Sequence, residues 1–169
     1  MTTEPARDIV VGVDHSAVSV AALRWAVVEA AASGRRVVAL RAWTFEPVYD
    51  LGAGIAVSPQ EAEEIQRYQL DDVITPVRAD HPEVEIQPEL VERSPSAALT
   101  EASKTAAMVV LGSHGRGRML SMLVGSVAEH CLREASCPVV VIPARTVPEP
   151  AQTLVTAEPE GTYYPGPLL

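Results

Sequence analysis

Apolar and polar residues follow one another along this chain in blocks that predict strands and helices in turn. Short apolar runs with polar or turn-forming ends predict buried strands over 8–14, 36–43, 106–112 and 137–143. Between the first two runs, an apolar stripe over 17–33 that includes Trp25 predicts a helix. Ser16 can cap its start and Gly34 its end. The chain therefore opens with a βαβ unit whose strands run parallel.

The middle of the chain predicts a long connection and then a polar helix. Residues 44–58 contain proline and glycine and predict a loop of the length that often forms a functional lid. Pro59 then opens a helix that runs to about Ala79, with acidic residues in its first turns. Pro76 lies near the end of this helix and favours an early stop.

The remaining patterns complete an α/β fold. Alternation over 84–91 predicts a half-exposed strand, and Pro88 within it favours an edge of the sheet. Two shorter helices are predicted over 95–105 and 126–135. Strands that alternate with helices predict a single five-stranded parallel sheet, doubly wound in the order 3-2-1-4-5, which is a Rossmann-like nucleotide-binding fold. We expect Trp25, Trp43 and Met108 to lie in the core.

Length and composition fit one domain followed by a tail. The chain has 169 residues, and we assign 1–144 to one α/β domain. Residues 145–169 are rich in proline with little periodicity, so we expect a flexible tail. The net charge of −9 argues against nucleic-acid or anionic-membrane partners, because these usually bind a basic patch.

The start of the chain and its cysteines predict a cytoplasmic protein. The first residues are polar, and no apolar run approaches the roughly 18 residues that a membrane span needs. Cys131 and Cys137 are too few and too close in sequence for a disulfide framework, so we expect free cytosolic thiols.

A glycine-rich segment directly after the strand predicted over 106–112 is the strongest chemical signal. Gly112, Gly115, Gly125 and Ser126 follow the spacing Gly-x2-Gly-x9-Gly-Ser. This is neither the dinucleotide fingerprint nor the P-loop, since no Gly-Lys-Ser/Thr occurs. Glycines let the backbone approach a phosphate, and the following helix offers unpaired N–H groups and a positive dipole end. The segment therefore predicts an anion-binding cradle.

The topology brings a second segment to the same place. In doubly wound sheets, ligands bind beyond the strand carboxyl ends where the strand order reverses, which here lies between the first and fourth strands. Asp14 follows the first strand and Gly112 ends the fourth, so both should reach one crevice. The Asp14 carboxylate suits a ribose hydroxyl or an amino group.

On these residues the chain resembles the ATP-binding subgroup of the universal stress protein family, over about residues 7–144. The glycine spacing is the family's nucleotide motif. The opening Val-Val-Gly-Val-Asp-His-Ser with Ala-Leu-Arg-Trp-Ala, and the closing Ser-Cys-Pro-Val-Val-Val-Ile-Pro, are similar to the actinobacterial branch. The resemblance implies binding of ATP, with a divalent ion such as Mg²⁺ held mainly by phosphates and water.

The resemblance also implies which residues contact the nucleotide. Asp14 would face the adenosine, the backbone of Ala42 the adenine, and Leu111 the ribose. The whole implied set is Gly12, Val13, Asp14, Ala42, Leu111, Gly112, Gly115, Gly125, Ser126 and Val127, with the last four beside the phosphates. Ser126 could cap the helix, bind phosphate, or do both.

Other charged residues near the motif keep more than one interpretation. Arg116 and Arg118 could meet γ-phosphate charge or remain solvated. His15 and His114 lie close to strand ends near Asp14, but no ligand spacing supports a metal site. His114 could act as a general base, although no nucleophile–base pair is evident. We therefore expect binding rather than turnover, with at most slow hydrolysis or autophosphorylation.

The partners follow from the last strand and from the nucleotide. An apolar edge strand is a liability unless it is covered, and the resemblance implies a homodimer through residues 137–143. Coverage of that edge by the tail is the alternative. The leading hypothesis is an ATP-dependent regulatory stress protein that acts on an unknown protein partner. An AMP or cyclic-AMP sensor, a slow ATPase and a nucleotide-free scaffold are the alternatives.

Overall fold

The computed structural model describes residues 7–45, 58–114 and 124–144 and has the predicted α/β architecture. Five parallel strands form one sheet in the predicted order β3-β2-β1-β4-β5. The strands are β1 (Ile9–Gly12), β2 (Val37–Trp43), β3 (Ile86–Glu92), β4 (Met108–Gly112) and β5 (Val139–Ile142). The helices are α1 (Ala17–Ser33), α2 (Pro59–Asp80), α3 (Pro95–Ser103) and α4 (Ser126–Glu134).

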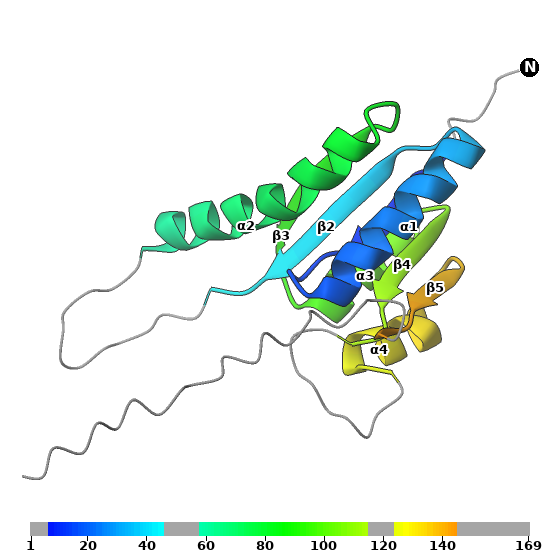
Figure 1. Ribbon diagram of the computed structural model, residues 1–169. Helices are drawn as coiled ribbons and strands as arrows, with labels where there is room; N and C mark the ends of the chain where they lie inside the picture. Colours follow the sequence, from blue (N-terminus) through cyan, green and yellow to red (C-terminus); the bar gives the residue numbers. More distant parts are fainter. Residues whose placement is uncertain (1–6, 46–57, 115–123, 145–169) are drawn as a thin grey trace, which may run out of the picture.

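Helices cover both faces of the sheet, so the molecule has three layers (Figure 1). On one face, Val11 and Val37 pack against α1 and α2 in a core that includes Leu23. On the other face, Val10 and Val109 pack against α3 and α4. Successive strand residues point to opposite faces of the sheet, and helices bury both faces. This explains why the sequences of the central strands are continuous apolar runs.

The ends of α1 match the capping residues predicted for it. The Ser16 hydroxyl accepts a hydrogen bond from the Ser19 amide at 3.2 Å. Gly34 adopts a left-handed conformation with φ of 64°, and its N–H donates to the Ala30 carbonyl. Both predictions are confirmed, because a side-chain cap and a glycine stop are local signals that the surrounding fold does not override.

Two expectations about the helices are wrong. Pro76 does not stop α2 early, because the helix continues to Asp80, one residue beyond the end predicted near Ala79. Pro76 is exposed, so water can reach the backbone carbonyl that it leaves without an amide partner, while Val77 is buried against the sheet. Trp25 is 38% exposed because it lies on the flank of α1, outside the stripe that the smaller residues such as Ala26 bury.

Smaller differences concern strand ends and two other expected core residues. All five strands begin and end within two residues of the predicted positions. Trp43 and Met108 are half-buried at the margin of the core. The predicted loop 44–58 and tail 145–169 fall largely or wholly outside the described residues.

Two further predictions concern membrane-spanning helices and the state of the cysteines. Among residues 7–45, 58–114 and 124–144, no helix combines the length and the apolar character needed to cross a bilayer. Cys131 and Cys137 are free thiols. Burial raises the pKa of the Cys131 thiol, which keeps it protonated at neutral pH.

Candidate functional site

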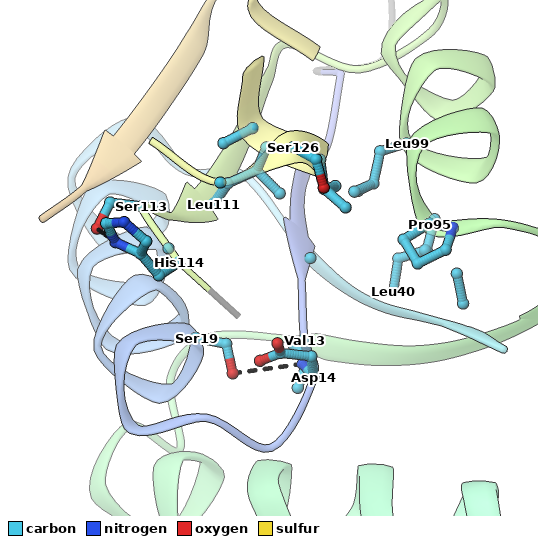
Figure 2. Close-up of a pocket in the computed structure, with 16 residues that line it drawn as sticks. Val13, Asp14, Ser19, Leu40, Pro95, Leu99, Leu111, Ser113, His114 and Ser126 are labelled. Carbon is cyan, nitrogen blue, oxygen red and sulfur yellow. Dashed lines mark hydrogen bonds between the residues drawn. The ribbon is translucent and has the colours of Figure 1, made fainter. Parts of the chain in front are cut away.

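A cavity of about 340 Å³ opens at the carboxyl ends of β1, β2 and β4 and beside the first turns of α3 and α4 (Figure 2). Its position is the strand-reversal point at which ligands bind in doubly wound sheets. The residues that line it are Gly12, Val13, Asp14, Ser19, Leu40, Ala42, Pro95, Leu99, Leu111, Gly112, Ser113, His114, Gly125, Ser126, Val127 and Ala128.

Hydrogen bonds fix the turn that carries Asp14 from β1 into α1. The Asp14 carboxylate accepts from the Ser16 amide at 3.1 Å and from the Ser16 hydroxyl at 2.6 Å. The Asp14 amide donates to the Ser19 hydroxyl at 3.3 Å (Figure 2). His15 between them has a φ of 72°, an uncommon conformation for a residue other than glycine. The turn therefore presents the Asp14 carboxylate at the cavity in a defined orientation.

The two strand-end glycines permit close packing around the cavity. A Cβ atom at residue 12 would lie 2.6 Å from Leu111 Cδ2 and 3.3 Å from Leu99 Cδ1. A Cβ atom at residue 112 would lie 2.8 Å from Val18 Cγ1 and 3.2 Å from the Val18 backbone carbon. Only hydrogen fits at either position without a shift of the neighbours.

The first turn of α4 turns its backbone toward the cavity. Gly125 is the N-cap, and its amide donates to the Ser113 carbonyl at 2.6 Å. Ser126, Val127 and Ala128 follow as the first helical residues, and among the described residues no side-chain cap closes this end. Ser126 is thus the first residue of the helix and not its cap, which corrects one of its predicted roles. Uncapped N–H groups and the positive end of the dipole make this turn suited to an anion.

Ser113 joins three segments beneath the cavity. Its side chain is buried, and its amide donates to the Ile142 carbonyl at 2.8 Å, at the end of β5. The Ser113 hydroxyl lies 3.0 Å from the Ala144 amide and 3.0 Å from His114 Nδ1. Together with the bond from Gly125, these contacts hold the end of β4, the end of β5 and the start of α4 in one arrangement.

The opposite part of the lining is apolar. Leu40 and Ala42 come from β2, Pro95 and Leu99 from α3, and Leu111 from β4. The cavity therefore combines an apolar wall with a carboxylate and a helix N-terminus. This combination suits a ligand that has a flat apolar part and an anionic part.

The described residues predicted to form the site all line this one cavity. They are Gly12, Val13, Asp14, Ala42, Leu111, Gly112, Gly125, Ser126 and Val127. Gly115 and Arg116, and also Arg118, lie outside the described residues. Segments almost one hundred positions apart, at Asp14 and at Gly112, therefore meet at one place, as the topology predicted.

Sequence reasoning missed part of the lining. Ser19, Leu40, Pro95, Leu99, Ser113 and Ala128 also line the cavity. Ala128 directly follows the predicted residue Val127, and Ser19 lies in the first turn of α1 five positions after Asp14, so nearness in sequence to predicted residues could have found both. Pro95 and Leu99 carry no local signal, because only the packing of α3 on the sheet brings them there.

The two histidines near the strand ends, His15 and His114, occupy different positions relative to the cavity. His114 lines the cavity, whereas His15 is not among the lining residues and its Nε2 lies 3.5 Å from Asp72 Oδ2 on α2. Within the described part of the chain, no group of three or more His, Cys, Asp or Glu residues is placed to hold a metal ion.

The fold is that of a parallel α/β protein with a cavity at its strand carboxyl ends. A sequence model of the universal stress protein family matches residues 5–143. The chain therefore belongs to the universal stress protein family, as its motifs predicted.

Individual relatives support this assignment. The chain is 35% identical over 134 residues to universal stress protein Rv2005c of Mycobacterium tuberculosis, which covers 79% of this chain and 44% of that protein. It is 33% identical to a universal stress protein of Mycolicibacterium smegmatis over 81% of this chain and 46% of that one. The chain thus spans less than half the length of these curated relatives.

Solved structures share the fold. A universal stress protein in complex with cAMP superposes with a TM-score of 0.61 at 23% identity, over 81% of this chain and 97% of that chain. The universal stress protein from Archaeoglobus fulgidus in complex with dAMP gives a TM-score of 0.59 at 24% identity, over 82% and 99%. A family member from Arabidopsis thaliana with AMP bound gives 0.54 at 16% identity, over 85% and 96%.

Proposed function

We propose that this universal stress protein binds an adenine nucleotide, and ATP in particular, in the cavity at the ends of β1 and β4. The observation that carries the proposal is the convergence of the strand-end residues Gly12–Asp14 with Gly112, Gly125 and the first turn of α4 around one cavity. An apolar wall next to an uncapped helix N-terminus matches an adenosine joined to phosphate.

The proposed contacts follow the polarity of the cavity. The apolar wall at Ala42 and Leu111 takes the base and ribose, and Asp14 accepts a hydrogen bond from the adenosine. Gly112 flanks the ribose with Leu111, and the amides of Ser126 and Val127 hold phosphate oxygens together with Gly125. We also assign phosphate contacts to Gly115 and Arg116, which lie outside the described residues. Mg²⁺ would arrive with the nucleotide, held by phosphates and water.

An adenosine monophosphate is the second candidate ligand. It is supported by the fold relatives described in complex with cAMP, dAMP and AMP. Both candidates use the same cavity and differ in the number of phosphates beyond the first turn of α4. For either ligand we propose regulation of a protein partner by the bound nucleotide, with at most slow hydrolysis or autophosphorylation.

We further propose a cytoplasmic homodimer with a flexible tail after its one domain. The free thiols Cys131 and Cys137 support a reducing compartment. Val139, Val140 and Val141 of the edge strand β5 are half-buried in the single chain, and antiparallel pairing with a second copy would cover them.

Mass spectrometry of the natively purified protein tests the proposal first, because a bound adenine nucleotide should co-purify with it. Competition calorimetry with ATP, AMP and cyclic AMP then ranks the candidates. Tighter binding of ATP supports the first proposal, and tighter binding of AMP or cyclic AMP supports the second. An absence of binding by all three at millimolar concentration would overturn both.

A further inference from the structure

Ser113 connects the start of α4 to the end of β5 through three hydrogen bonds. Its carbonyl accepts from the Gly125 amide at 2.6 Å, and its amide donates to the Ile142 carbonyl at 2.8 Å. Its hydroxyl accepts from the Ala144 amide at 3.0 Å. Ser113 is 4% exposed, so these bonds lie inside the protein, where they compete little with water. Two bonds to the end of β5 therefore fix the carbonyl to which the start of α4 is hydrogen-bonded.

The bond from Gly125 to Ser113 can form because residue 125 has no side chain. A Cβ atom at residue 125 would lie 3.2 Å from the Ser113 carbonyl oxygen and 3.6 Å from the His114 Cα atom. The φ of Gly125 is −74°, a value that any residue can adopt. Close approach to the end of β4, and not an unusual backbone conformation, therefore favours glycine here. Because Gly125 is the N-cap, the position of the Ser113 carbonyl also determines where α4 begins.

The same bond determines which amides of α4 can meet a phosphate group. The Gly125 amide donates to Ser113, and the Glu129 amide donates to the Gly125 carbonyl at 2.9 Å. Between them lie the amides of the first three helical residues, 126–128, which have no hydrogen-bond partner within the described part of the chain. All three residues line the cavity. Ser113 therefore sets the position of three donor groups relative to the strand ends that form the rest of the site.

We propose that Ser113 is a positioning residue for phosphate recognition, which acts through Gly125 and does not itself bind the nucleotide. The inference rests on the proposed nucleotide function and names the residue that orients the phosphate-binding part of the site. The apolar wall proposed for the base comes instead from β2 and α3, through residues such as Ala42 and Leu99. A change that loosens Ser113 should therefore weaken the binding of phosphate groups and leave the binding of adenosine nearly unchanged.

Calorimetry of the full chain with adenosine, AMP and ATP tests this division. Ser113→Ala removes the hydroxyl and leaves the Ala144 amide without this acceptor, so residue 113 is held less firmly. The affinity for AMP and for ATP should fall about threefold to tenfold, which is the effect of one hydrogen bond of ordinary strength. The affinity for adenosine should change by less than about twofold. An equal fall for adenosine and AMP, or no fall for AMP, would overturn the inference.

Ser103→Ala is the matched control. Ser103 is 1% exposed, and its hydroxyl accepts from the Ser136 amide at 2.9 Å, before the start of β5. It thus makes the same kind of bond near the opposite end of the same strand, and it is not one of the described residues that line the cavity. Both variants should lower the free energy of unfolding, whereas Ser113→Ala alone should lower the affinity for AMP. An equal loss of AMP affinity in both variants would indicate general loosening of the fold and overturn the specific role of Ser113.

Amide hydrogen exchange, followed by NMR, tests the positioning role without any ligand. The Gly125 amide should exchange about threefold or more faster in Ser113→Ala, because the carbonyl that accepts its hydrogen is less firmly held. The Gly34 amide, which donates to Ala30 at the far end of α1, should exchange at the same rate in both chains. Unchanged exchange at Gly125 would overturn the inference whatever the ligand.

The outcomes separate this inference from the function on which it rests. Binding of AMP or ATP that is equally strong in the wild-type chain and in Ser113→Ala overturns the inference alone. No heat with adenosine, AMP or ATP overturns the proposed function and the phosphate role together. If adenosine alone binds too weakly to measure, the comparison of the two serine variants and the exchange at Gly125 decide the inference. Circular dichroism checks that both variants fold.

Discussion

Gly12 and Gly112 end neighbouring strands, but a side chain at each would displace different neighbours. At residue 12 the nearest atoms are the far ends of Leu111 and Leu99, which are flexible and line the cavity. At residue 112 the nearest atoms belong to Val18, including its backbone. The same substitution should therefore affect ligand binding at one glycine and folding stability at the other.

Gly12→Ala should weaken nucleotide binding more than it weakens the fold. The added methyl would lie 2.6 Å from Leu111 Cδ2, and the least costly response is for the leucine ends to turn into the cavity. We expect affinity to fall about tenfold and the free energy of unfolding to fall by about 1 kcal/mol or less. Calorimetry and urea unfolding measure the two quantities. Unchanged affinity would show that the ligand does not occupy this wall.

Gly112→Ala should act mainly on stability. Its methyl meets the Val18 backbone at 3.2 Å, so α1 must move as a unit relative to β4. Overpacking of this kind lowers the free energy of unfolding by about 1–3 kcal/mol. Urea unfolding by circular dichroism measures the loss. A change below about 0.5 kcal/mol would mean that α1 gives way more easily than its packing indicates.

At the scale of elements, α2 has two unlike halves. Its buried residues all lie from Leu70 onward, where it packs on the sheet. Its first half is held instead by Arg41 of β2, which is buried and donates to Gln66 at 2.9 Å and to Gln69. The helix start is closed by a capping box between Ser58 and Glu61.

The capping box should make stability depend on pH. Hydrogen bonds from the Ser58 amide and hydroxyl lower the pKa of the Glu61 carboxyl. A lowered folded-state pKa contributes stability above the ordinary glutamate value of about 4.3, and this stability is lost as pH falls through the folded value. In urea unfolding, the wild-type chain should therefore lose stability relative to Glu61→Gln as pH falls below about 4. A constant difference between the two would contradict this role.

Local sequence signals predicted the first and last residues of α1 correctly, but they did not predict features that depend on tertiary packing. The limits of α1 were predictable because Ser16 and Gly34 act through their own backbone neighbourhood. The end of α2 near Ala79 was predicted to within one residue, but Pro76 gave a conflicting local signal for an earlier stop, which the burial of Val77 against the sheet overrides. The exposure of Trp25 depends in the same way on which side of α1 meets the sheet.

At the scale of the whole molecule, the two edge strands of the sheet, β3 and β5, differ in character. The β3 edge carries Pro88 and exposed polar residues, which protect it from pairing. The β5 edge has four apolar residues, Val139–Ile142, of which only Ile142 is buried in the single chain. A second copy is therefore proposed to pair at β5 and not at β3.

Val140→Lys should convert the proposed dimer to a monomer, because a charge on an edge strand opposes strand pairing. Gln87→Lys on the β3 edge is the matched control and should leave the assembly unchanged. Sedimentation equilibrium measures both, with circular dichroism to check the fold. A monomeric wild-type chain, or a Val140→Lys dimer, would rule out assembly through β5.

The position of the site was predictable from the sequence, and its complete lining was not. The glycine spacing and the strand order together predicted that Asp14 and Gly112 would meet, and both line the cavity. Leu99 and Pro95 come from a helix whose own sequence gives no reason to place it there. The role of Ser113 depends on Ala144 and Ile142, which only the pairing of β5 with β4 brings near.

The most direct test of the account is an amide NMR titration of the ¹⁵N-labelled full chain with ATP. The amides of Gly12, Gly112, Ser126 and Val127 should shift together and saturate at one nucleotide per chain, while Gln87 and Glu89 on β3 should not move. Saturable shifts confined to residues away from the ends of β1 and β4, or no shifts at millimolar ATP, would contradict it.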